Sequence, residues 1–164
     1  MKISSIYYKL HNLYYQYYFI PRWDSQAQKK GYLKKKIQRG IRMRLFFESK
    51  MCKLIYFDDF EKAEQRFINK FLRPGDIFVD VGANIGLFTL IAAKLVGKRG
   101  HVYAFEPSSR IHQRLIDNIK LNNLTNVSCY QLALSDRDGE AILYVPLDGY
   151  DAWSSFGKPY QGGG

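Results

Sequence analysis

The residues of this sequence that are most suited to binding or catalysis are two acidic residues and the glycine-containing loop between them. Asp80 begins the loop, Gly82 and Gly86 lie within it, and Glu106 follows twenty residues after Gly86. Asp80 lies near the end of one short apolar run, at residues 77–81, and Glu106 directly follows another, at residues 101–105; such runs are typical of buried parallel strands. Ligands of such sheets bind beyond the carboxyl ends of the strands, and glycine lets the backbone turn sharply and approach a ligand. The spacing predicts a nucleotide site in which Glu106 accepts both hydroxyls of an adenosine ribose.

The charge of Asp80 separates two candidate cofactors. The dinucleotide fingerprint Gly-x-Gly-x-x-Gly would need glycine at positions 82, 84 and 87, and this sequence has Asn84 and Leu87 at the last two. A carboxylate at the mouth of the loop would repel a pyrophosphate, whereas it would attract the ammonium and sulfonium groups of S-adenosylmethionine. The residues therefore favour S-adenosylmethionine over NAD.

The elements that must position this loop follow from the alternation of apolar runs and amphipathic segments. This order is typical of an α/β fold with a mostly parallel, Rossmann-like sheet and right-handed crossovers. We expect Gly97 to end the first helix of this part and Ser108 to cap the second. Strands are predicted over residues 77–81, 101–105, 127–132 and 140–145, and helices over 87–96 and 108–122.

Residues 1–59 are expected to form a basic, tyrosine-rich N-terminal extension, and residues 60–164 the cofactor-binding part. Residues 1–75 contain 17 lysines and arginines against 6 acidic residues, whereas residues 76–164 contain 8 against 9. The extension should hold a helix over residues 3–20 and a β-hairpin made of residues 41–47 and 51–57. A further helix is predicted over residues 60–72, followed by a turn over residues 73–76.

The basic segment 29–44 has several interpretations that composition leaves open. It could bind RNA, an anionic lipid or an anionic glycan, or it could be a solvated face. The helix over residues 3–20 should pack on the domain or on a partner chain, with a membrane surface as the alternative. Charged and polar residues interrupt its apolar run, so no transmembrane span is expected.

The two cysteines are expected to be reduced thiols of a cytoplasmic protein. Cys52 and Cys129 have no metal-ligand spacing, and the N-terminus has no signal-peptide core. His101 and His112 have no partner at metal-like spacing, so no metal site is predicted. The oligomeric state is left open.

Several motifs in series resemble the FkbM family of methyltransferases over roughly residues 60–156. The nine residues Phe-Val-Asp-Val-Gly-Ala-Asn-Ile-Gly around the glycine loop carry the resemblance most clearly, and Val-Tyr-Ala-Phe-Glu-Pro around Glu106 follows at family spacing. The remaining similar segments are Arg-Pro-Gly-Asp at 73–76, Asn-Ile-Lys-Leu-Asn at 118–122, Ala-Leu-Ser-Asp at 133–136 and Asp-Gly-Glu at 138–140.

The resemblance implies a class I methyltransferase fold that takes S-adenosylmethionine as methyl donor and methylates a hydroxyl of a sugar, glycolipid or related metabolite. Within the loop, Asp80, Gly82, Ala83, Asn84 and Gly86 would hold the methionine part of the cofactor. On the same basis Glu106 would hold the ribose, and Pro107 and Leu134 would flank the adenine.

One departure from the family pattern affects what this chain can do alone. Such families continue with further strands and an Asp-Val-Glu-Gly-like motif, whereas this sequence ends at Gln161-Gly162-Gly163-Gly164. The fold is therefore expected to be incomplete on its C-terminal side, and no catalytic residue is assigned. Two alternatives stay open, namely an RNA methyltransferase and a truncated, non-catalytic fragment that binds cofactor.

Overall fold

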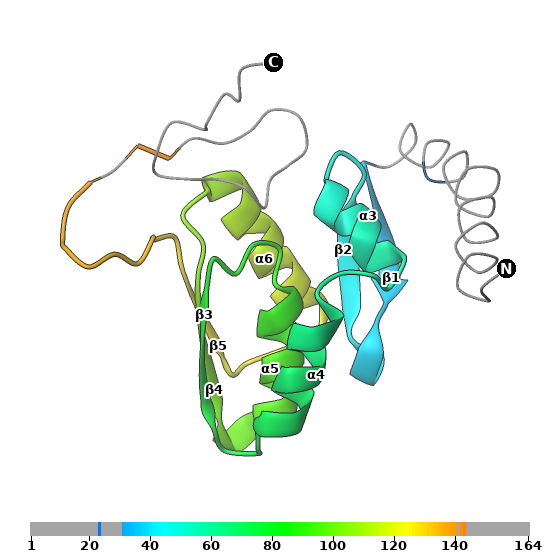
Figure 1. The fold of residues 1–164 in the computed structure, drawn as a ribbon, viewed down its shortest axis with the longest axis horizontal. Coiled ribbons are helices and arrows are strands. Elements are labelled where there is room, and N and C mark those ends of the chain that lie inside the picture. The colour runs from blue at the N-terminus through cyan, green and yellow to red at the C-terminus, as the bar shows by residue number, and fades with distance from the viewer. Residues whose placement is uncertain (1–22, 24–30, 141, 144–164) are drawn as a thin grey trace, which may run out of the picture.

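The computed structural model describes Trp23, residues 31–140 and residues 142–143. A two-stranded antiparallel sheet precedes a three-stranded parallel sheet, and helices lie between the two (Figure 1). In chain order the elements are β1 (Tyr32–Lys36), η2 (Gln38–Gly40), β2 (Arg42–Phe46), α3 (Lys50–Tyr56), α4 (Lys62–Phe71), β3 (Ile77–Val81), α5 (Leu87–Val96), η3 (Gly97–Arg99), β4 (His101–Phe105), α6 (Ser109–Leu121) and β5 (Val127–Tyr130).

The parallel sheet confirms the predicted α/β class and its first three strands. Its order is β3-β4-β5, with Asp80 beside Ala104 and Ala104 beside Cys129 in the register. Helices α4, α5 and α6 all lie on one side of this sheet (Figure 1). Gly97 ends α5 with a positive φ of 63°, as expected, because glycine adopts this conformation without a side-chain clash.

Two predicted elements fall partly or wholly outside the described residues. The helix expected over residues 3–20 is one of them. Of the strand expected over residues 140–145, the described positions Glu140, Ile142 and Leu143 are not in a strand. The third strand ends at Tyr130 and not at residue 132.

The predicted hairpin of residues 41–47 with 51–57 is wrong. β2 pairs instead with β1, which contains the lysines at 34–36, and residues 50–56 form helix α3. Ser49 caps this helix, since its side chain accepts a hydrogen bond from the Cys52 N–H at 3.1 Å. Met51, Cys52 and Ile55 are the buried residues of α3, a spacing that fits one helical face and not an alternating strand.

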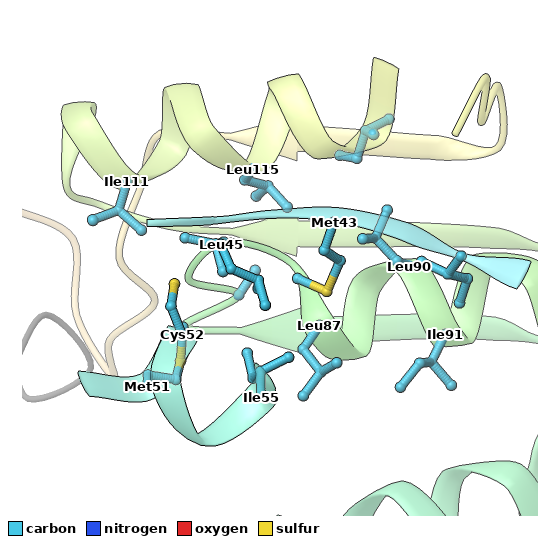
Figure 2. Packing of buried hydrophobic residues seen from close by; sticks show 14 of the residues in the cluster. Met43, Leu45, Met51, Cys52, Ile55, Leu87, Leu90, Ile91, Ile111 and Leu115 are labelled. Atoms are coloured by element: carbon cyan, nitrogen blue, oxygen red, sulfur yellow. The ribbon is translucent and has the colours of Figure 1, made fainter. Parts of the chain in front are cut away.

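The hydrophobic core joins the N-terminal hairpin to the helices that carry the parallel sheet. Met43 and Leu45 of β2, and Ile41 just before it, alternate along the chain and are fully buried. Figure 2 shows Met43 and Leu45 among side chains of α3, α5 and α6, including Leu90 and Leu115. Burying each large aliphatic side chain contributes about 1.5–3 kcal/mol, so β2 is held to α5 and α6 by apolar contact. The domain boundary at residue 59 remains a prediction.

One face of the parallel sheet and one side of α4 are apolar and exposed. Ile77, Val79 and Val81 of β3 are 67%, 51% and 60% exposed. Phe67 and Phe71 of α4 are more than half exposed and stack with ring centroids 4.3 Å apart. Among the described helices, none is long and apolar enough to cross a membrane.

Candidate functional site

The tips of the three parallel strands are tied together by backbone hydrogen bonds. The N–H groups of Gly82 and Ala83 donate to the Phe105 carbonyl at 3.0 and 2.9 Å, and the Glu106 N–H donates to the Tyr130 carbonyl at 3.0 Å. These bonds continue the pairing beyond the ends of β3 and β4. The glycine loop and Glu106 therefore lie side by side, as the sequence predicts for residues after parallel strands.

The Glu106 carboxylate is fixed by the backbone on both sides of it. Its Oε2 accepts the Asn84 N–H and its Oε1 accepts the Ser108 N–H, each at 3.0 Å. The side chain is buried. Because an ionised carboxylate has about four acceptor positions, hydroxyl groups of a ligand can bind it in addition to these N–H groups. The carboxylate is thus oriented before any ligand arrives.

The three loop residues with positive φ have different surroundings. Gly82 has a φ of 75°, and a Cβ there would meet nothing within 4 Å, so this side of the loop is open. Asn84 adopts a φ of 49°, and its Oδ1 accepts the Ile85 N–H at 2.8 Å, which stabilises a left-handed residue locally. Gly86 has a φ of 96°, and a Cβ there would lie 2.5 Å from Leu115 Cδ1. Its missing side chain thus allows α6 to pack closely, and a role for Gly86 in ligand binding remains a prediction.

Asp80 is a buried carboxyl whose charge is only partly compensated. The Thr89 hydroxyl of α5 donates to its Oδ2. Burial raises the pKa of Asp80 above its ordinary value of 3.8, although the hydrogen bonds from Thr89 act in the opposite direction. Burial also raises the pKa of Glu61, with the nearby charges of Glu64 and Asp80 adding to the effect. These carboxyl groups favour a cation in their vicinity.

An apolar pocket of about 610 Å³ lies beside Asp80, between α4, β3 and α5. Phe67, Phe78 and Phe88 form much of its wall, and Asp80 and Glu64 are its acidic members. This lining suits a ligand with apolar and cationic parts.

Cys129 is not a nucleophile for this site at neutral pH, because burial and the Asp80 charge raise the pKa of its thiol to about 11.

The other predicted site residues differ in exposure. Ala83 is buried and Pro107 is half-buried beside Glu106, whereas Leu134 is 47% exposed and lies beyond the end of β5. The placement of Pro107 and Leu134 around an adenine remains a prediction. Among the side chains that the structure describes, no three His, Cys, Asp or Glu residues gather as metal ligands.

Two residues that support the loop were missed by sequence reasoning. Thr89 binds Asp80, and Asn118 of α6 donates from Nδ2 to the Ile85 carbonyl at 2.9 Å. Thr89 is the only hydroxyl-bearing residue of helix α5, whose other residues are apolar except for Lys94, and that signal could have identified it. Asn118 is fully buried. The sequence did not indicate this burial, because many of the neighbouring residues in α6 are polar.

The raised pKa of Asp80 predicts a pH-dependent penalty on folding. The unfolded chain ionises Asp80 near its ordinary pKa of 3.8, whereas the folded chain holds the proton to higher pH. The stability that this group contributes is therefore fully present below pH 3.8 and is lost as the pH rises through the folded pKa. We expect Asp80→Asn, which cannot ionise, to be more stable than the unsubstituted chain at neutral pH without ligand.

Urea unfolding of both chains between about pH 4 and pH 7 measures this effect. The difference in the free energy of unfolding should grow with pH in favour of Asp80→Asn. A difference that stays constant with pH would show that Asp80 ionises normally. Asp138→Asn, at an exposed position after β5, is the control for replacing a carboxylate with a carboxamide.

Comparison with known proteins connects this geometry to a family. Residues 80–160 match the family model described as the methyltransferase FkbM domain. The AMB antimetabolite synthetase AmbE of Pseudomonas aeruginosa is 38% identical over 88 residues, which are 53% of this chain and 4% of AmbE. The 23S rRNA (uracil(1939)-C(5))-methyltransferase RlmD of Acinetobacter baumannii is 36% identical over 64 residues, which are 39% of this chain and 14% of RlmD. The chain thus spans small parts of these relatives.

A solved structure shows the same fold with a cofactor in place. TYW2 of M. jannaschii in complex with AdoMet (S-adenosylmethionine) is 28% identical, with a TM-score of 0.50 over 69% of this chain and 48% of that chain. The parallel sheet β3-β4-β5 with its helices is therefore part of a Rossmann-like methyltransferase fold. Over residues 80–160, just under half of its length, this chain is similar to the FkbM methyltransferases.

Proposed function

We propose that this chain binds S-adenosylmethionine at the tips of β3 and β4. The observation that carries the proposal is the Glu106 carboxylate, which both neighbouring backbone segments hold in place beside the glycine loop. A ribose needs an acceptor with two oxygens for its two vicinal hydroxyls, and Glu106 supplies them. Gly82 leaves open space on the ligand side of the loop. Pro107 and Leu134 would flank the adenine.

The charges around the apolar pocket agree with the methionine part of this cofactor. The charges of Glu64 and Asp80 add to the effect of burial in raising the pKa of Glu61, and Asp80 and Glu64 both line the pocket. The ammonium and sulfonium groups would be attracted by these carboxyl groups, whereas a pyrophosphate would be repelled. The site therefore fits S-adenosylmethionine better than NAD.

We infer that the reaction is methyl transfer to a hydroxyl oxygen of a sugar, glycolipid or related metabolite. The resemblance to the FkbM family, whose domain model matches residues 80–160, supports this substrate class. When bound, the cofactor supplies an electrophilic methyl group on sulfur. The residues of this chain hold and orient it, and the rate then depends on the alignment of the acceptor oxygen. We assign no base to the acceptor proton.

Calorimetric titration with S-adenosylhomocysteine, and with NAD in parallel, tests the cofactor proposal. Circular dichroism must first show that the 164-residue chain is folded. Binding of S-adenosylhomocysteine without NAD would support the proposal. A folded chain that binds NAD, or that binds neither ligand, would contradict it. The acceptor is tested separately, by transfer of radiolabelled methyl to a panel of sugars and glycolipids.

RNA is a second candidate acceptor, favoured by one comparison. RlmD, a 23S rRNA methyltransferase, is 36% identical to this chain over 64 residues. The excess of cations in residues 1–75 would also suit a phosphate backbone. A mobility shift with structured RNA that weakens with salt, together with methyl transfer to that RNA, would support this acceptor. The absence of binding at low salt would remove it.

A further inference from the structure

A basic groove of about 930 Å³ runs between β1, the η2 turn and α4, on a different side of α4 from the apolar pocket. We name it the α4 groove. Its charged lining residues are Lys35, Lys36, Lys62, Arg66, Lys70 and one acid, Asp58. Five cations that face one carboxylate repel one another when no anion is present.

The oxygens of the carboxamide side chains in the α4 groove accept hydrogen bonds from neighbouring side chains. Gln38 donates to the Gln65 Oε1 at 2.9 Å, and Asn69 donates to the Gln38 Oε1 at 2.9 Å. The Asn69 Oδ1 in turn accepts the Arg39 Nε–H at 2.9 Å. This chain of bonds holds α4 against the η2 turn. It also removes three acceptors from the groove, so the polar groups that remain for a ligand are mainly donors.

The cations of the α4 groove differ in how far they are engaged. Lys62 pairs with Asp58, and the Lys35 ammonium donates to the backbone carbonyls of Ile55 and Tyr56. The side chains of Arg66 and Lys36 are exposed and make no hydrogen bond or ion pair with the part of the chain that the structure describes. Lys62 and Lys35 are thus held in place, whereas the side chains of at least Arg66 and Lys36 can move onto a bound anion.

We propose that the α4 groove binds a small molecule carrying two or more phosphate groups. Its volume lies within the range of small-molecule sites, about 300–1,000 Å³. Along α4 the basic residues extend from Lys62 to Lys70, which corresponds to about 12 Å at 1.5 Å per residue, enough for a diphosphate group and its substituent. Arg66 presents a planar fork of N–H groups that matches phosphate oxygens.

The lining favours a compact phosphate ligand over single-stranded RNA. Proteins that bind single strands combine cations with aromatic side chains on which bases stack. The α4 groove is lined by lysine, arginine, carboxamide, one acidic and one aliphatic residue, without an aromatic side chain among its described lining. The proposal is independent of the cofactor site, because α4 separates the groove from Asp80.

Calorimetric titration of the full chain with inorganic pyrophosphate tests the proposal, with orthophosphate as a weaker comparison ligand. Arg66→Ala and Lys36→Ala should each weaken pyrophosphate binding about tenfold, the loss of one charge-assisted contact. Arg99→Ala is the matched control, since Arg99 is an exposed arginine of η3 away from the groove. Thermal unfolding should be the same for the three variants.

A tenfold loss in Arg66→Ala and Lys36→Ala, with Arg99→Ala unchanged, would support the site. Equal loss in all three variants would show nonspecific attraction to a basic protein and overturn it. The absence of pyrophosphate binding at about 50 mM salt would overturn it as well. A parallel titration with a twelve-nucleotide RNA tests whether RNA occupies the groove instead. If it binds through Arg66 and pyrophosphate does not displace it, RNA is the occupant and the proposal is wrong.

Discussion

Replacing Glu106 with alanine is expected to weaken S-adenosylhomocysteine binding about a hundredfold or more. A hydrogen bond to a charged group contributes about 1.5–3 kcal/mol, and each 1.4 kcal/mol changes affinity tenfold. The substitution removes the acceptor for the ribose hydroxyls. It also removes the acceptor of the Asn84 and Ser108 N–H groups, which hold the glycine loop in place. Calorimetry on folded protein measures the affinity directly.

Glu106→Gln separates the charge of the carboxylate from its size. The carboxamide has only one oxygen, so its NH₂ group must face either the Asn84 or the Ser108 N–H, and the loop loses one of its bonds. We expect an affinity close to that of Glu106→Ala. Glu140→Ala, at an exposed position, is the control and should bind normally. If Glu106→Gln and Glu106→Ala both keep full affinity while folded, the ribose is not held by Glu106.

The parallel part of the fold could be predicted because its local signals agree with its tertiary structure. The run at Ile77–Val81 is short, β-branched and bounded by turn residues, and the structure pairs it with the next such run at His101–Phe105. Gly97 gives an unambiguous helix end. The positions of Asp80 and Glu106 follow from the strand ends alone, so the centre of the candidate site was predictable too.

The N-terminal hairpin was not predictable in the same way. β1 includes three consecutive lysines, which have low strand propensity, and only its pairing with β2 makes it a strand. Residues 50–56 are apolar enough for either a strand or a helix, and periodicity cannot separate short runs of this kind. The Ser49 cap was the available signal for a helix. The Ser49 cap was weaker evidence than the pattern of residues 41–47 and 51–57. Both segments are rich in residues that favour strands, and a short polar segment joins them.

The supporting residues of the site depend on how helices pack, which one sequence does not specify. Thr89 reaches Asp80 only because α5 crosses the sheet at that strand. Leu115 explains why position 86 is glycine, although it lies on the next helix of the chain. The sequence motif therefore indicated a ligand for both loop glycines, whereas the structure places open space at Gly82 and a protein side chain at Gly86.

The motif Asn-Ile-Lys-Leu-Asn has a structural role that its sequence did not reveal. Asn118 of α6 and Asn122, the C-cap residue of that helix, lie one turn apart and face the edge of β2 that is not paired with β1. The Oδ1 atoms accept the N–H groups of Arg44 and Arg42 at 2.7 and 2.8 Å, and the Asn122 Nδ2 donates to the Arg42 carbonyl at 2.7 Å. The two carboxamides thus bond to the edge as a neighbouring strand would, and they satisfy backbone groups that would otherwise be buried without partners.

We expect Asn118→Leu to lower the free energy of unfolding by about 3 kcal/mol, because an unpaired buried polar group costs about 1–3 kcal/mol. Leucine has a similar volume, but it leaves the Arg44 N–H and the Ile85 carbonyl without their partner. Urea unfolding measures the loss. Gln113→Leu is the matched control, since it makes the same kind of change at an exposed position of α6 and should cost less than about 0.5 kcal/mol.

Because Asn118 also binds the Ile85 carbonyl, the same substitution should weaken S-adenosylhomocysteine binding under conditions in which the protein remains folded. Asn122→Leu provides the comparison, because Asn122 binds β2 and α6 without contacting the glycine loop. It should lower stability while leaving the affinity nearly unchanged. If both variants lose affinity equally, the loss reflects general destabilisation. A loss confined to Asn118→Leu would show that α6 positions the loop that faces the ligand.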